Sequence, residues 1–269
     1  MDSASLALAL QRDDIAVECV ASTGSTNADL LARARAAVPA QTILRAAMEQ
    51  TSGRGRLGRR WLSSSGGALL FSLALPWQRE LATTAPVTLA CGLAVAGLLR
   101  ARGLPARVKW PNDIQLDGRK LAGILTELAE APGGERTLVV GMGLNLFVTP
   151  DDRSAIGQPV AELAEWVERS LLEQNRSQWL ADCAGAMLDA ARAFERAGFA
   201  PLQGAYTDLL AYRDAPVQVS GSGGVVHEGV LRGVDAGGQL LLERAGRLEA
   251  LLQGELSLRA APGLSEAAA

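Results

Sequence analysis

Residues 109–127 read KWPNDIQLDGRKLAGILTE, a segment in which short apolar runs alternate with turn residues. Asp117 and Gly118 favour the positive φ angles of a tight hairpin turn between two such runs. Pro111 keeps the residue before it out of helical dihedral angles, so a strand that enters the segment must end there. The segment therefore predicts successive strands of a sheet, at 107–110, 114–116 and 120–128.

Further strands and helices are predicted outward from this segment. Strand-length apolar runs occur at 17–20, 42–48, 68–75 and 138–146. Apolar residues at helical spacing occur at 28–37, at 87–102 and from about 160 to 197. The first of these helices should be capped by Ser25, Thr26 or Asn27. From residue 216 the pattern changes to short runs separated by glycines, at 217–219, 225–234, 239–242, 248–252 and 255–258.

The fold class predicted from these patterns is α+β. A mixed β-sheet flanked by helices is expected in residues 1–212, where strand and helix patterns are interspersed. Residues 213–269 are expected to form a small C-terminal β-barrel, because five short strands suit such a barrel. The two predicted domains therefore meet near residue 213.

Composition excludes several classes of protein. The chain has 26 Lys plus Arg against 29 Asp plus Glu and a net charge of −3, so it lacks the broad basic surface that polyanion binding needs. No segment approaches the roughly 20 apolar residues that span a bilayer, and the N-terminus lacks the basic region of a signal peptide. We therefore expect a cytoplasmic protein without a membrane partner. The three cysteines have no CxxC spacing and His227 is the single histidine, which argues against disulfides or a zinc site.

Residues 53–61, GRGRLGRRW, hold four arginines and three glycines. Glycine lets a backbone approach a ligand closely, and the guanidinium group presents a planar fork of donors that fits carboxylate or phosphate. A mobile loop that closes over an anion is one interpretation. A solvated basic surface loop and a nucleic-acid patch are the others. The acidic balance of the whole chain favours a small anionic ligand.

Lys120 is a second candidate site residue. It lies in an otherwise apolar strand, where a lysine must either meet an anion or extend to solvent. Asn112 and Asp113 form a turn whose side chains either tie down the backbone or point into a site. Asn145 belongs to GMGLNL at 141–146, whose glycines indicate close backbone packing or ligand contact.

Taken in order, these motifs resemble those of one enzyme family, the bacterial biotin protein ligases. The matching segments cover almost the entire chain: STN at 25–27, Gln50 with GRGRLGRRW, KWPNDI at 109–114, RKLAGILTE at 119–127, GMGLN at 141–145 and GELSLR at 254–259. The resemblance implies a class II synthetase-like catalytic domain and an SH3-like C-terminal barrel. It also implies an ATP-dependent ligase that forms biotinyl-5′-AMP and passes the biotinyl group to one lysine of a biotin carboxyl carrier protein. Mg²⁺ would enter with ATP, without a metal held by the protein itself.

The resemblance also implies roles for individual residues. The biotin ring would be surrounded by Ser25, Thr26, Asn27 and Gln50. The biotin and adenylate loop would carry Arg54, Gly55 and Arg56, and Lys120 would meet the biotin carboxylate and the α-phosphate. The nucleotide and its magnesium would be held by Arg56, Arg59, Asn112, Asp113, Asn145 and Arg259. The predicted catalytic set is Lys120, Arg54 and Asp113, and either Lys120 or Asp113 would assist the attack of the carrier lysine.

Three alternative functions stay open at this point, of which the third is an adaptor with an inactive site, against which the intact Lys120 and arginine-rich loop argue. A lipoate-type protein ligase shares the fold type and the need to activate a carboxylate. A nucleic-acid-binding module would use the arginine-rich loop and the small barrel, although the acidic balance argues against it. Homodimerisation through a sheet edge is compatible with the sequence but has no motif to support it. About 20 residues precede the first predicted strand, too few for the winged-helix domain of larger relatives, so we expect no DNA binding and no repressor activity.

Overall fold

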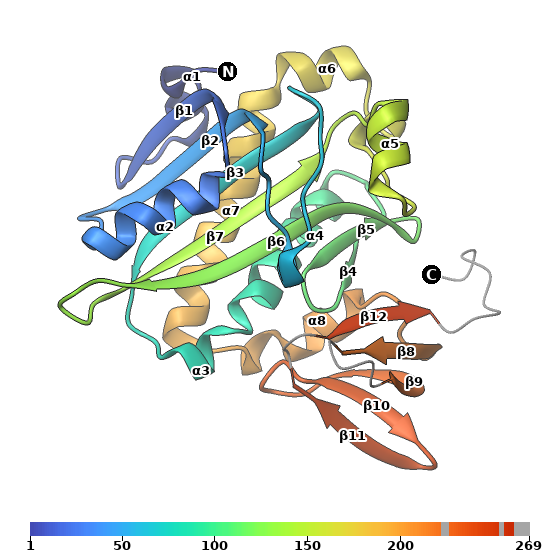
Figure 1. Ribbon diagram of the computed structural model, residues 1–269. Helices are drawn as coiled ribbons and strands as arrows, with labels where there is room; N and C mark the ends of the chain where they lie inside the picture. The colour runs from blue at the N-terminus through green and yellow to red at the C-terminus, as the bar shows by residue number, and fades with distance from the viewer. Residues whose placement is uncertain (222–225, 253–255, 261–269) are drawn as a thin grey trace.

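Seven strands form the larger of two β-sheets (Figure 1). The computed structural model describes residues 1–221, 226–252 and 256–260. The strand order is β1-β2-β3-β7-β6-β5-β4, and only β1 and β2 run parallel, so the sheet is mixed as predicted. The strands are β1 (Ile15–Thr23), β2 (Thr42–Gln50), β3 (Ala68–Trp77), β4 (Arg107–Lys109), β5 (Asp113–Leu116), β6 (Arg119–Glu130) and β7 (Arg136–Asn145).

Helices cover both faces of this sheet (Figure 1). Helix α2 packs on one face across β2, β3, β6 and β7, whereas α4 and α7 pack together on the opposite face and α1 contacts α7 and β1. The helices are α1 (Ser3–Leu10), α2 (Thr26–Ala36), α3 (Leu81–Thr84), α4 (Val87–Ala101), α5 (Pro150–Ile156), α6 (Arg169–Gln174), α7 (Arg176–Ala197) and α8 (Gln203–Leu209). Short 3₁₀ turns lie at Arg56–Gly58, Leu163–Glu165 and Ala200–Leu202.

Strand β7 illustrates why both faces of the sheet are buried. Val139 packs with Leu30 and Leu31 of α2, whereas Leu138 and Val140 belong to the larger core on the opposite side. Successive side chains of a strand point to opposite faces, so an unbroken apolar run fits a sheet covered on both sides. The apolar run predicted at 138–146 therefore reflects burial on two faces.

The segment Ala82–Ala101 corrects one expectation from composition. It is 20 residues long with a mean hydropathy of 1.7, which is long and apolar enough to cross a membrane. The expectation that no segment approaches this limit was therefore wrong. In the structure 56% of its most apolar window is buried, and α4 packs against α7 and β6. Its apolar composition is explained by its place in the core.

The start of α2 places polar side chains at the sheet. Ser25 has an extended backbone, and its hydroxyl accepts a hydrogen bond from the Ala28 amide at 3.4 Å, which confirms the predicted cap. Thr26 and Asn27 follow in the first turn and are almost fully buried. The start of the helix thereby holds polar side chains against Gln50 at the end of β2 and Ser72 in the middle of β3.

Five strands form the second sheet, which is antiparallel in the order β11-β10-β9-β8-β12. They are β8 (Pro216–Ser220), β9 (Val226–Val234), β10 (Leu240–Arg244), β11 (Arg247–Leu251) and β12 (Ser257–Ala260). The turn between β9 and β10 contacts the residue that follows β4 of the larger sheet. There the Trp110 indole N–H donates to the Gly238 carbonyl at 3.1 Å. Gly238 has φ +79°, and an added methyl group there would lie 2.8 Å from Leu89.

The α+β class and the small C-terminal β unit are confirmed. Four helices, α1, α3, α5 and α8, were not predicted. The helical section expected from about residue 160 was wrong at its start, because Val160 forms a parallel β-bridge with Lys120 and the helices begin at Arg169 and Arg176. Gly254 and Glu255 of the GELSLR motif, residue 225 and the tail after 260 lie outside the described residues. The domain boundary near residue 213 stays a prediction.

Candidate active site

One cavity contains every site residue predicted from the sequence. It lies where β6 and β7 face the loop between β2 and β3, and the C-terminal sheet contributes Leu256 and Arg259 to its wall. The predicted residues that line it are Ser25, Thr26, Asn27, Gln50, Arg54, Gly55, Arg56, Arg59, Asn112, Asp113, Lys120, Asn145 and Arg259. The structure thus brings together segments more than two hundred positions apart in the chain, and the role of each residue stays a prediction.

The arginine-rich loop, residues 53–61, forms a small hairpin across the cavity. The Trp61 amide donates to the Gly53 carbonyl at 3.0 Å, and the Gly55 amide donates to the Arg59 carbonyl at 2.7 Å. The turn needs positive φ at Leu57 (59°) and Gly58 (71°). Arg54 and Arg60 form the β-bridge of the hairpin, whereas Arg56 begins the 3₁₀ turn at its tip and Arg59 follows that turn, so the arginines lie at different places along the hairpin.

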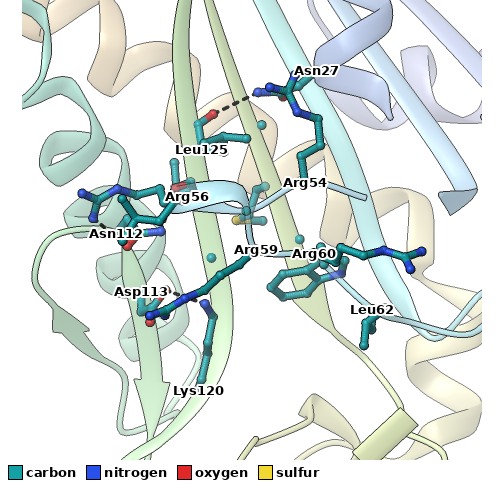
Figure 2. A pocket seen from close by; sticks show the side chains of 18 of the residues that line it. Asn27, Arg54, Arg56, Arg59, Arg60, Leu62, Asn112, Asp113, Lys120 and Leu125 are labelled. Atoms are coloured by element: carbon teal, nitrogen blue, oxygen red, sulfur yellow. Dashed lines mark hydrogen bonds and ion pairs between the residues drawn. The ribbon is translucent and has the colours of Figure 1, made fainter. Parts of the chain in front are cut away.

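The directions of these arginines are visible in Figure 2. Arg59 extends toward Asp113 and Arg56 toward the neighbouring Asn112, whereas Arg54 extends toward Asn27 at the other end of the cavity. Arg60 points away from Asp113, and its guanidinium donates to the Thr51 carbonyl at 3.1 Å. The loop therefore contributes cations to two separate parts of the site.

Asp113 lies at the centre of the charged part. Its carboxylate is 2.6 Å from the ammonium group of Lys120, and both side chains are mostly buried. The Arg56 guanidinium donates to the Asn112 side-chain oxygen at 3.3 Å, next to this pair. The Asn112 side chain in turn donates to the Ile124 carbonyl at 3.1 Å, which fixes the turn on β6.

Lys109 is a site residue that the sequence reasoning missed. It lines the cavity and pairs with Asp113 in the β4–β5 register. Burial lowers the pKa of Lys109; the charge of Asp113 opposes this shift, and the neighbouring cations Lys120, Arg259 and Arg59 add to it. Burial likewise lowers the pKa of Arg56, with Asp113 opposing. The pKa of Lys109 is therefore lowered first by its burial and further by the cations around it.

The charge count of the cavity wall is strongly uneven. Among its described residues the cations are Arg54, Arg56, Arg59, Arg60, Lys109, Lys120 and Arg259. The sole carboxylate among them is Asp113. Such a surplus of donors suits a ligand with several negative charges.

The neutral end of the cavity is a hydrogen-bond network at the start of α2. The Gln50 side-chain oxygen accepts from the Thr26 amide at 2.7 Å and from the Thr26 hydroxyl at 3.0 Å. The Thr26 hydroxyl lies 2.7 Å from the Ser72 hydroxyl, which donates to the Asn27 side-chain oxygen at 2.5 Å. Ser72 was also missed, because its role depends on the packing of α2 against β3. These groups can hold a polar, uncharged ring.

Trp61 packs on glycines of two neighbouring strands. Gly123 and Gly143 are cross-strand partners in β6 and β7, and an added methyl group at Gly143 would lie 2.4 Å from the indole ring. The Lys120 ammonium lies 5.8 Å from the centre of the same ring. The buried indole N–H has no hydrogen-bond partner among the described residues. Close packing against Trp61 therefore explains the glycine at position 143. Trp61, after Lys109 and Ser72, is the third residue of the cavity wall that the sequence reasoning missed.

Asn145 links the cavity to the segment before the 3₁₀ turn at Leu163–Glu165. Its side-chain nitrogen donates to the Ala161 carbonyl at 3.0 Å and, more weakly, to the Lys120 carbonyl at 3.5 Å. The Ala161 amide also donates to the Lys120 carbonyl at 2.9 Å. These bonds fix the backbone from which Lys120 extends.

Comparison with known proteins gives a consistent picture. Residues 19–145 match the Biotin/lipoate A/B protein ligase family. The chain is 31% identical over 244 residues to a biotin–[acetyl-CoA-carboxylase] ligase of Paracoccus denitrificans, covering 83% of this chain and 92% of that protein. It is 34% identical over 213 residues to the bifunctional ligase/repressor BirA of Escherichia coli K12, covering 79% of this chain and 65% of the length of that relative.

A solved structure extends the similarity to the fold. A biotin protein ligase from Aquifex aeolicus, in complex with biotin and ATP, superposes with a TM-score of 0.75 at 26% sequence identity. The match covers 91% of this chain and 99% of the Aquifex chain.

Proposed function

The chain belongs to the biotin protein ligase family, and we propose that it joins biotin to a lysine of a biotin carboxyl carrier protein in two steps. In the first, a biotin carboxylate oxygen attacks the α-phosphorus of ATP, which gives biotinyl-5′-AMP and releases pyrophosphate. In the second, the carrier lysine amine attacks the acyl carbon and AMP leaves. A carrier domain of acetyl-CoA carboxylase is the proposed partner, by analogy with the Paracoccus relative.

One observation carries this proposal: the cavity has a cationic part and a neutral polar part in one continuous site. A carboxylate and a triphosphate repel each other, so their reaction needs cations placed around both. Lys120, Arg56 and Arg59 converge on that part of the site. Donors aimed at the charge that develops during reaction typically contribute about two to three orders of magnitude each in rate.

The neutral part would hold the ring of biotin. A ureido ring has N–H donors and a carbonyl acceptor, and the side chains of Ser25, Thr26, Asn27 and Gln50 supply matching groups. Their network lies across the cavity from Asp113, so the valerate chain would point the carboxylate toward Lys120. The dithiolane ring of lipoate offers no strong donor or acceptor to these groups, which favours biotin over the lipoate-type alternative.

Lys120 and Asp113 have a second proposed task. A carrier lysine attacks only as the neutral amine, and the mixed anhydride must meanwhile be kept from water. The Asp113 carboxylate is the nearest base on this side of the cavity, and Lys120 stabilises the departing phosphate. The hairpin of the arginine-rich loop would cover the anhydride and exclude water.

Magnesium fits this site as an ion that arrives with ATP. Among the described residues no group of three or more acidic, histidine or cysteine side chains could hold a metal. Magnesium commonly binds through one or two carboxylates together with substrate phosphates, and Asp113 with the Asn112 side-chain oxygen could supply the protein part. The ion would neutralise phosphate charge beside the cations of the cavity.

Repressor activity is not part of the proposal. Support comes from the Aquifex enzyme, which the chain matches over 99% of its length, and from the net charge of −3. We also propose that the protein works in the cytoplasm, where ATP and carrier proteins meet.

The test is exchange of labelled pyrophosphate into ATP. We expect exchange that depends on biotin and is at least about ten-fold slower with lipoate at the same concentration, because a polar site rejects an analogue that leaves its groups unpaired. An equal rate of exchange with lipoate would favour the lipoate-type protein ligase over the biotin ligase. Absence of exchange with either acid would overturn the proposed activation step.

A further inference from the structure

Glu127 of β6 joins the arginine-rich loop to the neutral end of the cavity. One carboxylate oxygen accepts from the Asn27 side-chain nitrogen at 2.9 Å, and the other lies 3.0 Å from the Arg54 guanidinium. Its side chain is 23% exposed and does not line the cavity. Glu127 therefore acts on the site only through Asn27 and Arg54.

The bond from Asn27 fixes the direction of an entire chain of hydrogen bonds. An ionised carboxylate only accepts, so the Asn27 amide must turn its nitrogen toward Glu127. The same nitrogen donates to the Leu125 carbonyl at 3.3 Å (Figure 2). Both N–H groups are then used, and the Asn27 oxygen faces Ser72 and accepts from its hydroxyl. The remaining capacity of Asn27 toward a ligand is that of an acceptor.

Asn27 has no room to adopt another position. A methyl group on Gly141 would lie 2.0 Å from the Asn27 side-chain oxygen, so this side chain rests directly on the backbone of β7. It is also almost fully buried. Because its place is fixed by packing, the choice between an oxygen and a nitrogen facing the cavity depends on its two acceptors, the Glu127 carboxylate at 2.9 Å and the more distant Leu125 carbonyl at 3.3 Å.

The two contacts of Glu127 differ in strength. The Arg54 side chain is 47% exposed, and exposed ion pairs contribute little to stability. That contact can break when the arginine-rich loop opens. The bond to buried Asn27 is shielded from water and persists, so the polarity of the ring pocket is kept while the loop moves.

We propose that Glu127 is a positioning residue that sets the donor and acceptor polarity of the ring pocket. It makes Asn27 an acceptor for a ring N–H, which selects a cyclic urea or a related ring with N–H groups. The inference rests on the proposed function, since biotin is the ligand in question. It assigns to the last residue of RKLAGILTE a role in substrate recognition without substrate contact.

Glu127→Gln tests this polarity. The introduced amide no longer enforces acceptance and can donate to the Asn27 oxygen, so the Asn27 amide can turn over, give up its bond to the Leu125 carbonyl and present N–H to the ring. We expect the Kd for biotin to rise about ten-fold or more, because a donor then faces a donor and buried groups lose their partners. The KM for ATP at saturating biotin should stay within about two-fold, since the cationic part of the site is unchanged.

Glu130→Gln is the matched control. Glu130 lies three positions further along β6, is exposed, and pairs with Arg136 at 3.7 Å outside the cavity. This variant should bind biotin like the wild type. Thermal unfolding of both variants shows whether weaker biotin binding comes from the changed hydrogen bonds in the pocket or from an unstable fold.

A compensating variant distinguishes polarity from a merely structural role. Asn27→Asp alone places two carboxylates against each other and should bind biotin poorly. Combined with Glu127→Gln it restores an acceptor in the pocket and a donor at position 127, so the double variant should recover affinity lost by either change. The inference is overturned if the Glu127→Gln variant binds biotin like the wild type. It is also overturned if the double variant loses as much binding free energy as the two single variants together. Either result leaves the proposed function untouched. A wild-type protein that binds no biotin would instead overturn the proposed function, and this inference with it.

Discussion

The ammonium group of Lys120 lies 2.6 Å from the Asp113 carboxylate, inside a cavity where Asp113 faces a surplus of cations. Without a ligand, each of these two groups is the other's nearest opposite charge. An anion that enters can take over the contact with Lys120 and leave Asp113 free for a metal ion or a proton. This exchange links substrate binding to the chemistry proposed for the site.

Lys120→Met should abolish most adenylate formation. We expect biotin-dependent pyrophosphate exchange to fall by about two to three orders of magnitude, the loss typical of one donor at a developing negative charge. Arg119→Met is the control, because Arg119 precedes it on β6 but pairs with Glu165 outside the cavity. Similar rates for both variants would remove Lys120 from the proposed catalytic set.

Gly143→Ala should displace Trp61 from the cavity wall. The new methyl group would lie 2.4 Å from the indole ring, so the ring must move. We expect weaker binding of biotin and ATP, measured by calorimetry, and a changed Trp fluorescence spectrum. Gly97→Ala, at an exposed position of α4, meets nothing within 4 Å and should instead stabilise the fold by about 1 kcal/mol. Unchanged binding by Gly143→Ala would contradict the tight packing of Trp61.

Lys109 should make stability depend on pH in the alkaline range. Burial lowers its pKa below the ordinary value of 10.5, so the unfolded chain binds the proton more readily than the folded protein. The charged form is therefore unfavourable in the folded state, and this cost disappears as the pH rises toward 10.5. Lys109→Met should raise the free energy of unfolding most at neutral pH, with the gain shrinking by pH 10.

Urea unfolding of both proteins at a series of pH values measures this difference. The same variant should bind ATP more weakly, because a cation of the cavity is lost. A variant less stable than the wild type at neutral pH would show that the ion contacts of Lys109 outweigh its burial.

The hairpin at 109–127 was predictable because its signals are local. Asp117 (φ 47°) and Gly118 (φ 71°) adopt the positive angles that their residue types favour, and the flanking runs form β5 and β6. Helix α5 carried local signals as well, with Thr149 as cap before Pro150, but was not predicted. A helix this short contains too few apolar residues at helical spacing to be recognised from the sequence pattern.

The site was predicted where its residues lie in recognisable motifs and missed where they meet only through the fold. Ser72 is one of several residues in an apolar strand, and nothing near it in the sequence indicates a contact with Asn27. Lys109 meets Asp113 across a strand pair. Glu127 acquires its two partners through the packing of α2 and the position of the arginine-rich loop. Such long-range contacts leave no periodic or motif signal in one sequence.

Trp110→Phe should loosen the C-terminal sheet. Loss of the indole N–H leaves the buried Gly238 carbonyl without its partner, and we expect a loss of about 2 kcal/mol in stability. The KM for ATP should rise as well, because Arg259 reaches the cavity from that sheet. The double variant Trp110→Phe with Arg259→Ala should raise the KM for ATP, expressed as a free energy, by less than the sum of the increases in the two single variants. Full additivity would mean that the contact does not position Arg259.

The most direct test of the proposed ligase is the mass of a biotin carboxyl carrier domain after incubation with the protein, ATP, magnesium and biotin. We predict a gain of one biotinyl group on a single lysine, lost when ATP is left out and strongly reduced with the Lys120→Met variant. An unchanged carrier mass, with no adenylate formed from biotin and ATP, would contradict the assignment.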